Sequence, residues 1–187
     1  MFSIYNNGKS SPMGYSQTLE NGLKISNFAL FSSAADAVEL CLFRDGKESR
    51  FAMSRTDDIW HVAIEGVELN DEYAFRITGK NNCTLANPQK LMLDPYAKAV
   101  THKPDLSSSE ARSIFLLNDE RDNAAVAPKG RIIDEHFDWS GDCKSSIPWA
   151  KTIVYELNVK GFSQLNSRIP ENIRGTYAAL AHPENIA

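Results

Sequence analysis

The chain has 187 residues, of which 42% are hydrophobic and 24% charged, as is ordinary for a soluble globular protein with one domain and some additional chain, or with two small domains. The formal net charge is −4 and there is no long basic run, so we expect no binding to nucleic acid or to an anionic membrane surface, which both require clustered Lys and Arg. No stretch approaches the roughly 20 apolar residues of a membrane-spanning helix.

The N-terminal residues and the cysteines indicate the cellular compartment of the protein. Residues 1–14 are polar and rich in turn formers and lack the basic start and apolar core of a signal peptide, which predicts a cytoplasmic protein. Cys41, Cys83 and Cys143 are odd in number, far apart and outside any C-x-x-C motif, so we expect no disulfide framework, no metal site and no cofactor. Asn82-Cys83-Thr84 matches the glycosylation sequon, which we interpret as chance in the absence of a secretion signal.

The first hundred residues predict short strands separated by turns. Apolar side chains recur with a period of two, and the Asp45-Gly46 turn favours a hairpin. The expected strands cover residues 28–31, 38–43, 50–53, 59–64 and 73–77, and the inward sets are Val38, Leu40 and Leu42, then Trp60, Val62 and Ile64, then Tyr73, Phe75 and Ile77. This pattern is typical of antiparallel sheets packed face to face.

The next part of the chain is less regular. Residues 87–97 are bracketed by two prolines and predict an extended segment that leaves the sandwich. Residues 103–112 are polar and rich in serine, as in a surface loop, with a short capping-box pattern at residues 107–110. Residues 131–133 predict one further strand, and residues 140–148 a second loop.

The pattern changes after residue 150. Residues 152–159 are nearly continuous in bulky side chains, which indicates a strand buried on both faces. His182-Pro183 is typical of a helix start with proline in its first position. Because a helix begins just before Ala187, we interpret the chain as truncated.

Several strings then resemble one family in order and over nearly the whole chain. They are NFALFS (27–32), VELCLF (38–43), NPQKLMLDPYA (87–97), DNAA with APK (122–125 and 127–129), IVYELNVKGF (153–162), RGTY (174–177) and LAHP (180–183). Together they resemble the N-terminal part of the bacterial glycogen-debranching enzymes of the isoamylase type, in the α-amylase superfamily. At position 158 this family usually carries His, whereas this chain carries Asn158.

The resemblance implies a fold and a division into domains. It implies a mainly β protein with an immunoglobulin-like antiparallel β-sandwich of the glycogen-binding-module class at residues 1–140. A linker at 141–151 and the first strand of an incomplete (β/α)8 barrel at 152–187 would follow. Retaining glycoside hydrolysis needs two carboxyl groups about 5 to 5.5 Å apart, and in this family they lie beyond residue 187. We therefore expect no catalytic residue in this chain.

Several residues allow both a structural and a functional interpretation. Trp60 and Tyr73 are candidate glycan contacts, although their inward position favours core packing. Trp139, Trp149, Tyr155 and Glu156 are candidates for the junction between sandwich and barrel, with Glu156 expected to be buried and partnered. His61 alternates with the inward set, which favours a surface position over a catalytic or ligand role.

Three classes of function stay open at this stage. The resemblance favours a positioning domain of an α-1,6-glucan debranching glycosidase, with α-glucan as the partner of the whole enzyme. The alternatives are a stand-alone α-glucan-binding module and a protein-interaction domain of immunoglobulin-like topology. Residues 43–56 contain no Trp that could serve as an exposed sugar platform, which argues for weak or no independent glucan binding.

Overall fold

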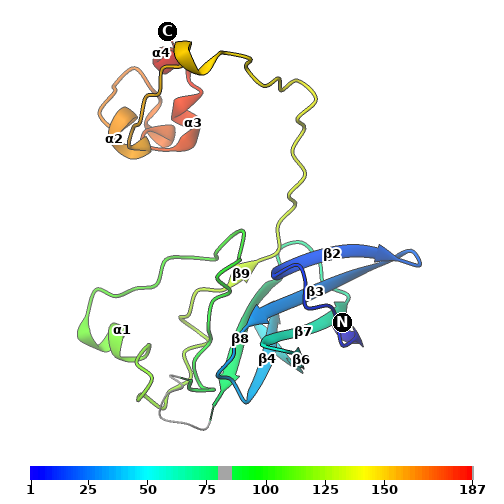
Figure 1. Ribbon diagram of the computed structural model, residues 1–187. Coiled ribbons are helices and arrows are strands. Elements are labelled where there is room, and N and C mark those ends of the chain that lie inside the picture. Colours follow the sequence, from blue (N-terminus) through cyan, green and yellow to red (C-terminus); the bar gives the residue numbers. More distant parts are fainter. Residues whose placement is uncertain (80–85, 187) are drawn as a thin grey trace. The chain divides into compact units, whose positions relative to one another are not determined.

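The computed structural model describes residues 1–79 and 86–186 and forms two compact units, Met1–His136 and Phe137–Ala187 (Figure 1). The first unit is a sandwich of antiparallel sheets, and the second consists of short helical segments. The mainly β fold class is thereby confirmed. The sequon at residues 82–84, including Cys83, lies outside the described residues.

The first unit contains two sheets. The first sheet has the order β1 (Ser3–Asn6), β7 (Ile59–Glu65), β3 (Leu23–Phe31) and β2 (Gly14–Glu20), and β6 (Ser54–Thr56) also pairs with β7. The second sheet has the order β5 (Lys47–Ala52), β4 (Ala37–Arg44), β8 (Glu72–Thr78) and β9 (Gly130–Arg131).

The expected strands at the centre of both sheets are present. Asp45 and Gly46 both have positive φ angles, 52° and 74°, and the hairpin that they form pairs Arg44 with Lys47. This is the backbone that a two-residue turn between right-twisted strands requires, and glycine adopts it without steric cost.

The core lies between the sheets and contains the predicted inward sets. Phe28 from β3, Leu40 and Leu42 from β4, and Ile64 from β7 are fully buried there. Ile77 is partly buried against the same cluster. Alternation of apolar residues thus identified the inner faces of β4, β7 and β8 correctly.

The outer face of the second sheet is also covered, which the sequence did not predict. Cys41 and Ala74, on this face, pack with Leu91 and Ala127 from the long connection between β8 and β9. Residues 87–97 do not leave the sandwich as expected, because Met92 exchanges two backbone hydrogen bonds with Phe75 on β8, at 2.8 and 2.9 Å. The free backbone groups of a strand edge favour such pairing.

The same connection contains one short helix. Helix α1 (Ser109–Ser113) begins after Ser108, whose hydroxyl accepts a hydrogen bond from the Ala111 amide at 3.0 Å. The cap therefore lies one residue later than the start of the predicted capping box, and the third helical position holds Ala111, which cannot return a side-chain bond.

The second unit contains η1 (Trp149–Lys151), α2 (Val159–Ser163), η2 (Glu171–Ile173), α3 (Tyr177–Leu180) and α4 (Pro183–Ile186). The helix start at Pro183 is confirmed. The predicted strand at residues 152–159 is wrong for this chain: residues 152–158 have no regular structure, and Ile153 is 93% exposed. A parallel strand takes its hydrogen bonds from neighbouring strands, and the described part of this unit contains none.

Candidate functional site

Trp60 and Tyr73 lie in the core, with 6% and 2% of their surface exposed. The Trp60 indole N–H donates to the Ser32 carbonyl at 3.0 Å, and the Tyr73 hydroxyl donates to Asp94 Oδ2 at 2.8 Å. Neither ring offers an open face to a sugar. Of the two interpretations of these aromatic residues, burial supports core packing.

His61 is not on the surface as the sequence favoured. Its side chain does point away from the core set, but only 6% of the residue is exposed. One ring nitrogen, Nδ1, lies 2.7 Å from the Asn7 carbonyl, and the other, Nε2, lies 2.8 Å from the Thr56 hydroxyl. The chain at Asn7 and strand β6 cover this position, so both ring nitrogens are used structurally.

A buried ion cluster lies on the outer side of the second sheet. Arg76 is 1% exposed and pairs with Glu48 at 2.9 Å and with Asp122 at 2.9 Å. Burial alone would raise the pKa of Glu48, but hydrogen bonds from Arg76 and Arg50 outweigh it and lower the pKa to about 2. This cluster fastens the β8–β9 connection to the sheet and gives each of the three guanidinium nitrogens an acceptor.

The four residues expected at a domain junction all lie in the second unit and are all exposed. Trp149 is 88% exposed, Tyr155 is 76% exposed, and Trp139 packs on Phe137 with ring centroids 4.5 Å apart. Glu156 is exposed, contrary to the expected burial, because its segment forms no paired strand. Their role at a junction stays a prediction.

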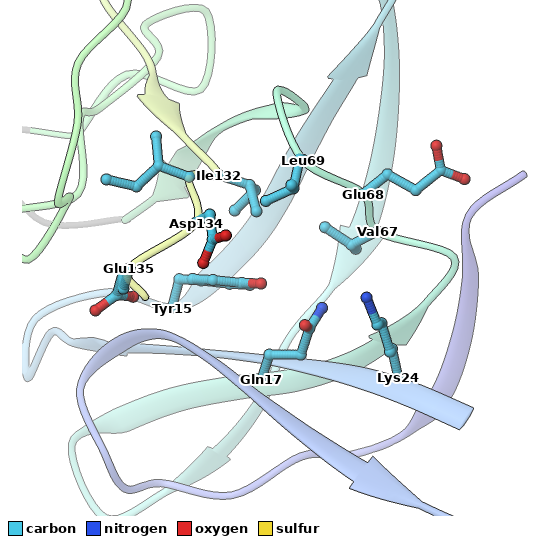
Figure 2. Close-up of a pocket in the computed structure, with 10 residues that line it drawn as sticks. Tyr15, Gln17, Lys24, Val67, Glu68, Leu69, Ile132, Asp134 and Glu135 are labelled. Carbon is cyan, nitrogen blue, oxygen red and sulfur yellow. The ribbon is translucent and has the colours of Figure 1, made fainter. Parts of the chain in front are cut away.

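A pocket opens at the edge of the sandwich, and the sequence did not reveal it (Figure 2). We call it the edge pocket; it has a volume of about 600 Å³ and is lined by Tyr15, Gln17, Lys24, residues 67–69 and residues 132–135. These residues come from β2, β3, the β7–β8 connection and the chain after β9. Because the pocket joins four distant segments, no local motif marks it.

Tyr15 lies at the centre of the edge pocket. Figure 2 shows its ring extending across the space between Asp134 and Gln17. Its inner side packs on Phe28 and Tyr73, with ring centroids 5.4 and 6.4 Å away. Burial raises the pKa of its hydroxyl; a hydrogen bond with Ser26 lowers it by less, and the Glu135 charge raises it, so the net shift is upward and the hydroxyl stays protonated at neutral pH.

Two further classes of site find no support in the described part of the chain. Residues 1–79 and 86–186 contain no group of three or more His, Cys, Asp or Glu placed to hold a metal ion. None of the helices described there is long and apolar enough to cross a membrane.

Comparison with known proteins shows a family match for part of the chain and relatives that are similar to nearly all of it. Residues 12–97 match carbohydrate-binding module 48, the isoamylase N-terminal domain. The glycogen operon protein GlgX homolog of Haemophilus influenzae is 61% identical over 100% of this chain and 28% of its own length. The glycogen debranching enzyme of Yersinia enterocolitica is 42% identical over 96% of this chain and 27% of its own length. The chain thus spans little more than a quarter of these relatives.

Solved structures agree in fold. The pullulanase of Paenibacillus barengoltzii, in complex with maltohexaose and α-cyclodextrin, matches 94% of this chain and 23% of its own with a TM-score of 0.64 and 20% identity. The type I pullulanase of Bacillus subtilis, in complex with maltose, matches 96% of this chain and 20% of its own with a TM-score of 0.62 and 22% identity. Residues 12–97 thus match carbohydrate-binding module 48, the isoamylase N-terminal domain, and nearly the whole chain is similar to the N-terminal part of bacterial glycogen debranching enzymes.

Proposed function

We propose that this chain is the N-terminal, non-catalytic part of an α-1,6-glucan debranching glycosidase, and that its sandwich packs against a catalytic barrel and positions it. The similarity to a glycogen operon protein covers 100% of the chain and that to a glycogen debranching enzyme 96%, which supports this proposal. The filled interior of the sandwich supports it too, because the central aromatic residues serve packing.

The observation that carries the proposal is the exposed apolar segment of the second unit. Trp149, Ile153, Val154 and Tyr155 are each at least 76% exposed, although they are large and apolar and close in sequence. Contiguous exposed apolar surface of this kind marks a region that another protein surface covers. In the resembled family, residues 153–159 correspond to the first strand of the barrel, which supports the barrel as the covering part.

The proposal also holds that the chain does not hydrolyse glucan. A complete barrel takes about 250 residues, which is more than the 187 residues of this chain. The adjacent acid pairs Asp57-Asp58 and Asp134-Glu135 lie in turns or irregular chain. Purified chain incubated with phosphorylase-limit dextrin of glycogen should release no maltooligosaccharide; release above a boiled-protein control would overturn the proposal.

A second candidate function is a stand-alone α-glucan-binding module, which the carbohydrate-binding-module match and the edge pocket favour. Affinity electrophoresis in gels with and without glycogen separates the two. A positioning domain with weak glucan affinity should migrate at nearly the same rate in both gels, relative to a non-binding marker. Strong retardation in glycogen would favour the stand-alone module.

A further inference from the structure

The edge pocket has firm walls. The β7–β8 connection is tied to the chain after β9 by two backbone hydrogen bonds, from the Asn70 amide to the Ile132 carbonyl and from the Ile132 amide to the Asp71 carbonyl, both 2.9 Å. On the opposite side, β2 pairs with β3 in continuous register, with Tyr15 opposite Phe28. The pocket therefore lies between elements that hydrogen bonds hold in place, as in most preformed ligand sites.

The interior of the edge pocket is apolar on one side. Val67 and Ile132 are buried, and Leu69 adds exposed apolar surface beside them. The half-buried ring of Tyr15 completes this surface and is supported from behind by Phe28 and Tyr73. An aromatic ring held in this way presents a flat apolar surface at little cost in side-chain entropy.

The charges at the pocket leave it close to neutral. Glu68 pairs with Arg44 at 3.7 Å and Glu135 pairs with Lys98, both partners outside the lining. Lys24 forms no ion pair within the described residues, and Asp134 accepts a bond from the His136 amide at 2.9 Å. One unpaired cation therefore balances one carboxylate, which favours neither an anionic nor a cationic ligand.

The remaining polar groups can bond hydroxyls; the Gln17 amide also donates a long hydrogen bond, of 3.4 Å, to the Ser26 hydroxyl, and its carbonyl oxygen accepts no bond from Ser26. Gln17 and Lys24 point from their strands into the same space as Tyr15 (Figure 2), and the Asp134 carboxylate lies on the other side of that ring. Amide, ammonium, phenol and carboxylate groups around an apolar surface match a ligand that has apolar faces edged by hydroxyls. A pyranose has this character.

We propose that the edge pocket binds a short stretch of neutral α-glucan chain, with the Tyr15 ring under a glucosyl face and with Gln17, Lys24 and Asp134 bonding its hydroxyls. The choice of α-glucan among neutral glycans rests on the proposed function. Binding is weak, with a dissociation constant on the order of 1 mM for one short chain, because the pocket is open and carries a single aromatic platform. The pocket holds a glucan chain next to the enzyme and takes no part in bond cleavage.

The test is an NMR titration of the ¹⁵N-labelled 187-residue chain with maltoheptaose and, separately, with cellohexaose. Maltoheptaose should give saturable amide shifts at residues 15–17, 24, 67–69 and 132–135, and cellohexaose should not. Tyr15→Leu keeps an apolar side chain on Phe28 but removes the platform, and should weaken binding by about tenfold or more. Gln17→Ala, at an exposed position, should weaken it by about threefold. Tyr177→Leu, at an exposed tyrosine of the second unit, is the matched control and should bind like the wild-type chain.

Each outcome addresses a separate claim. Saturable shifts that map away from the pocket, or undiminished binding by Tyr15→Leu with a native-like spectrum, would overturn the pocket and leave the α-glucan assignment standing. Equal binding of cellohexaose in the pocket would overturn the α-glucan assignment. Absence of shifts at concentrations about tenfold above the expected constant would overturn the pocket alone, since the limit-dextrin assay tests the proposed function independently.

Discussion

Gly130 lies directly against the ring of Tyr73: a Cβ atom at position 130 would fall 2.5 Å from Tyr73 Cε1. The two residues are also paired across β8 and β9, so the strand can approach the ring only without a side chain. Through this approach, the short strand β9 closes one side of the core over a tyrosine whose hydroxyl is already held by Asp94.

Gly130→Ala should therefore destabilise the first unit. Neither the fully buried ring nor the paired backbone can shift freely, so we expect a loss of about 1 to 3 kcal/mol in the free energy of unfolding, as for other overpacked cores. Urea denaturation monitored by Trp fluorescence measures it. Gly141→Ala is the control, because nothing lies within 4 Å of a Cβ there; equal stability of the two variants would contradict the expectation.

The ion cluster at Arg76 predicts a pH dependence of stability. The pKa of Glu48 is about 2 in the folded chain against an ordinary value of 4.5. Because the folded-state pKa is lowered, the contribution is complete above pH 4.5 and is lost as the pH falls toward 2. It is about 3 kcal/mol at neutral pH, the free energy that corresponds to this difference in pKa.

Glu48→Gln should remove this contribution and flatten the curve of unfolding free energy against pH between about 4.5 and 2, the range that the two pKa values bracket. Urea titrations at several pH values measure it. Glu120→Gln, at an exposed glutamate, should follow the wild-type curve. A Glu48→Gln curve as steep as that of the wild-type chain would show that Arg76 does not couple Glu48 to folding.

The cysteines should differ sharply in reactivity. Burial, with a smaller contribution from the hydrogen bond to Glu48, raises the pKa of the Cys41 thiol to about 12, whereas Cys143 is exposed. In a Cys83→Ser background, a thiol reagent such as DTNB should modify Cys143 quickly and Cys41 only after unfolding, because the thiolate is the reactive form. Rapid modification of two thiols in the native chain would contradict the buried position of Cys41.

The exposed apolar segment of the second unit predicts an association. Wild-type chain mixed with the part of the Haemophilus influenzae homologue beyond its match should co-elute with it in size-exclusion chromatography. Ile153→Asp should weaken this association by about tenfold or more, because it places a charge in apolar surface that binding would bury. Ile4→Asp, at an exposed isoleucine of β1, is the matched control. If Ile153→Asp associates like the control, residues around Ile153 do not form the contact.

The inner faces of the sandwich could be read from the sequence, and other surfaces could not. Alternation revealed Leu40, Trp60 and Phe75 because each is followed two residues later by another core side chain. Strand β2 escaped notice because, apart from Tyr15, its side chains are polar or exposed, as an edge strand tolerates. The residue type of Arg76 suggests an exposed position, and its burial is compensated by two residues that are distant in the sequence, Glu48 and Asp122.

The errors in the second unit and at the edge pocket have a related cause. Ile153 and Val154 have the composition of a buried strand, but composition does not supply the neighbours whose backbone groups a strand needs. The edge pocket depends on Tyr15 and Asp134, which are brought together by sheet pairing rather than by spacing in the sequence. Local patterns predict local structure, and both cases depend on long-range partners.

The Met92–Phe75 bridge and the cover over the second sheet determine how far along the chain the folded unit extends. Cutting the chain at residue 97, the end of the family match, would keep this bridge but remove Asp122 from Arg76 and Ile132 from the core. The compact unit Met1–His136 is therefore longer than the matched module by some forty residues at its C-terminal side (roughly residues 98–136), and these residues cover the second sheet and complete the core. A graft of residues 12–97 onto another protein would carry a sandwich whose second sheet has lost much of the cover over its outer face.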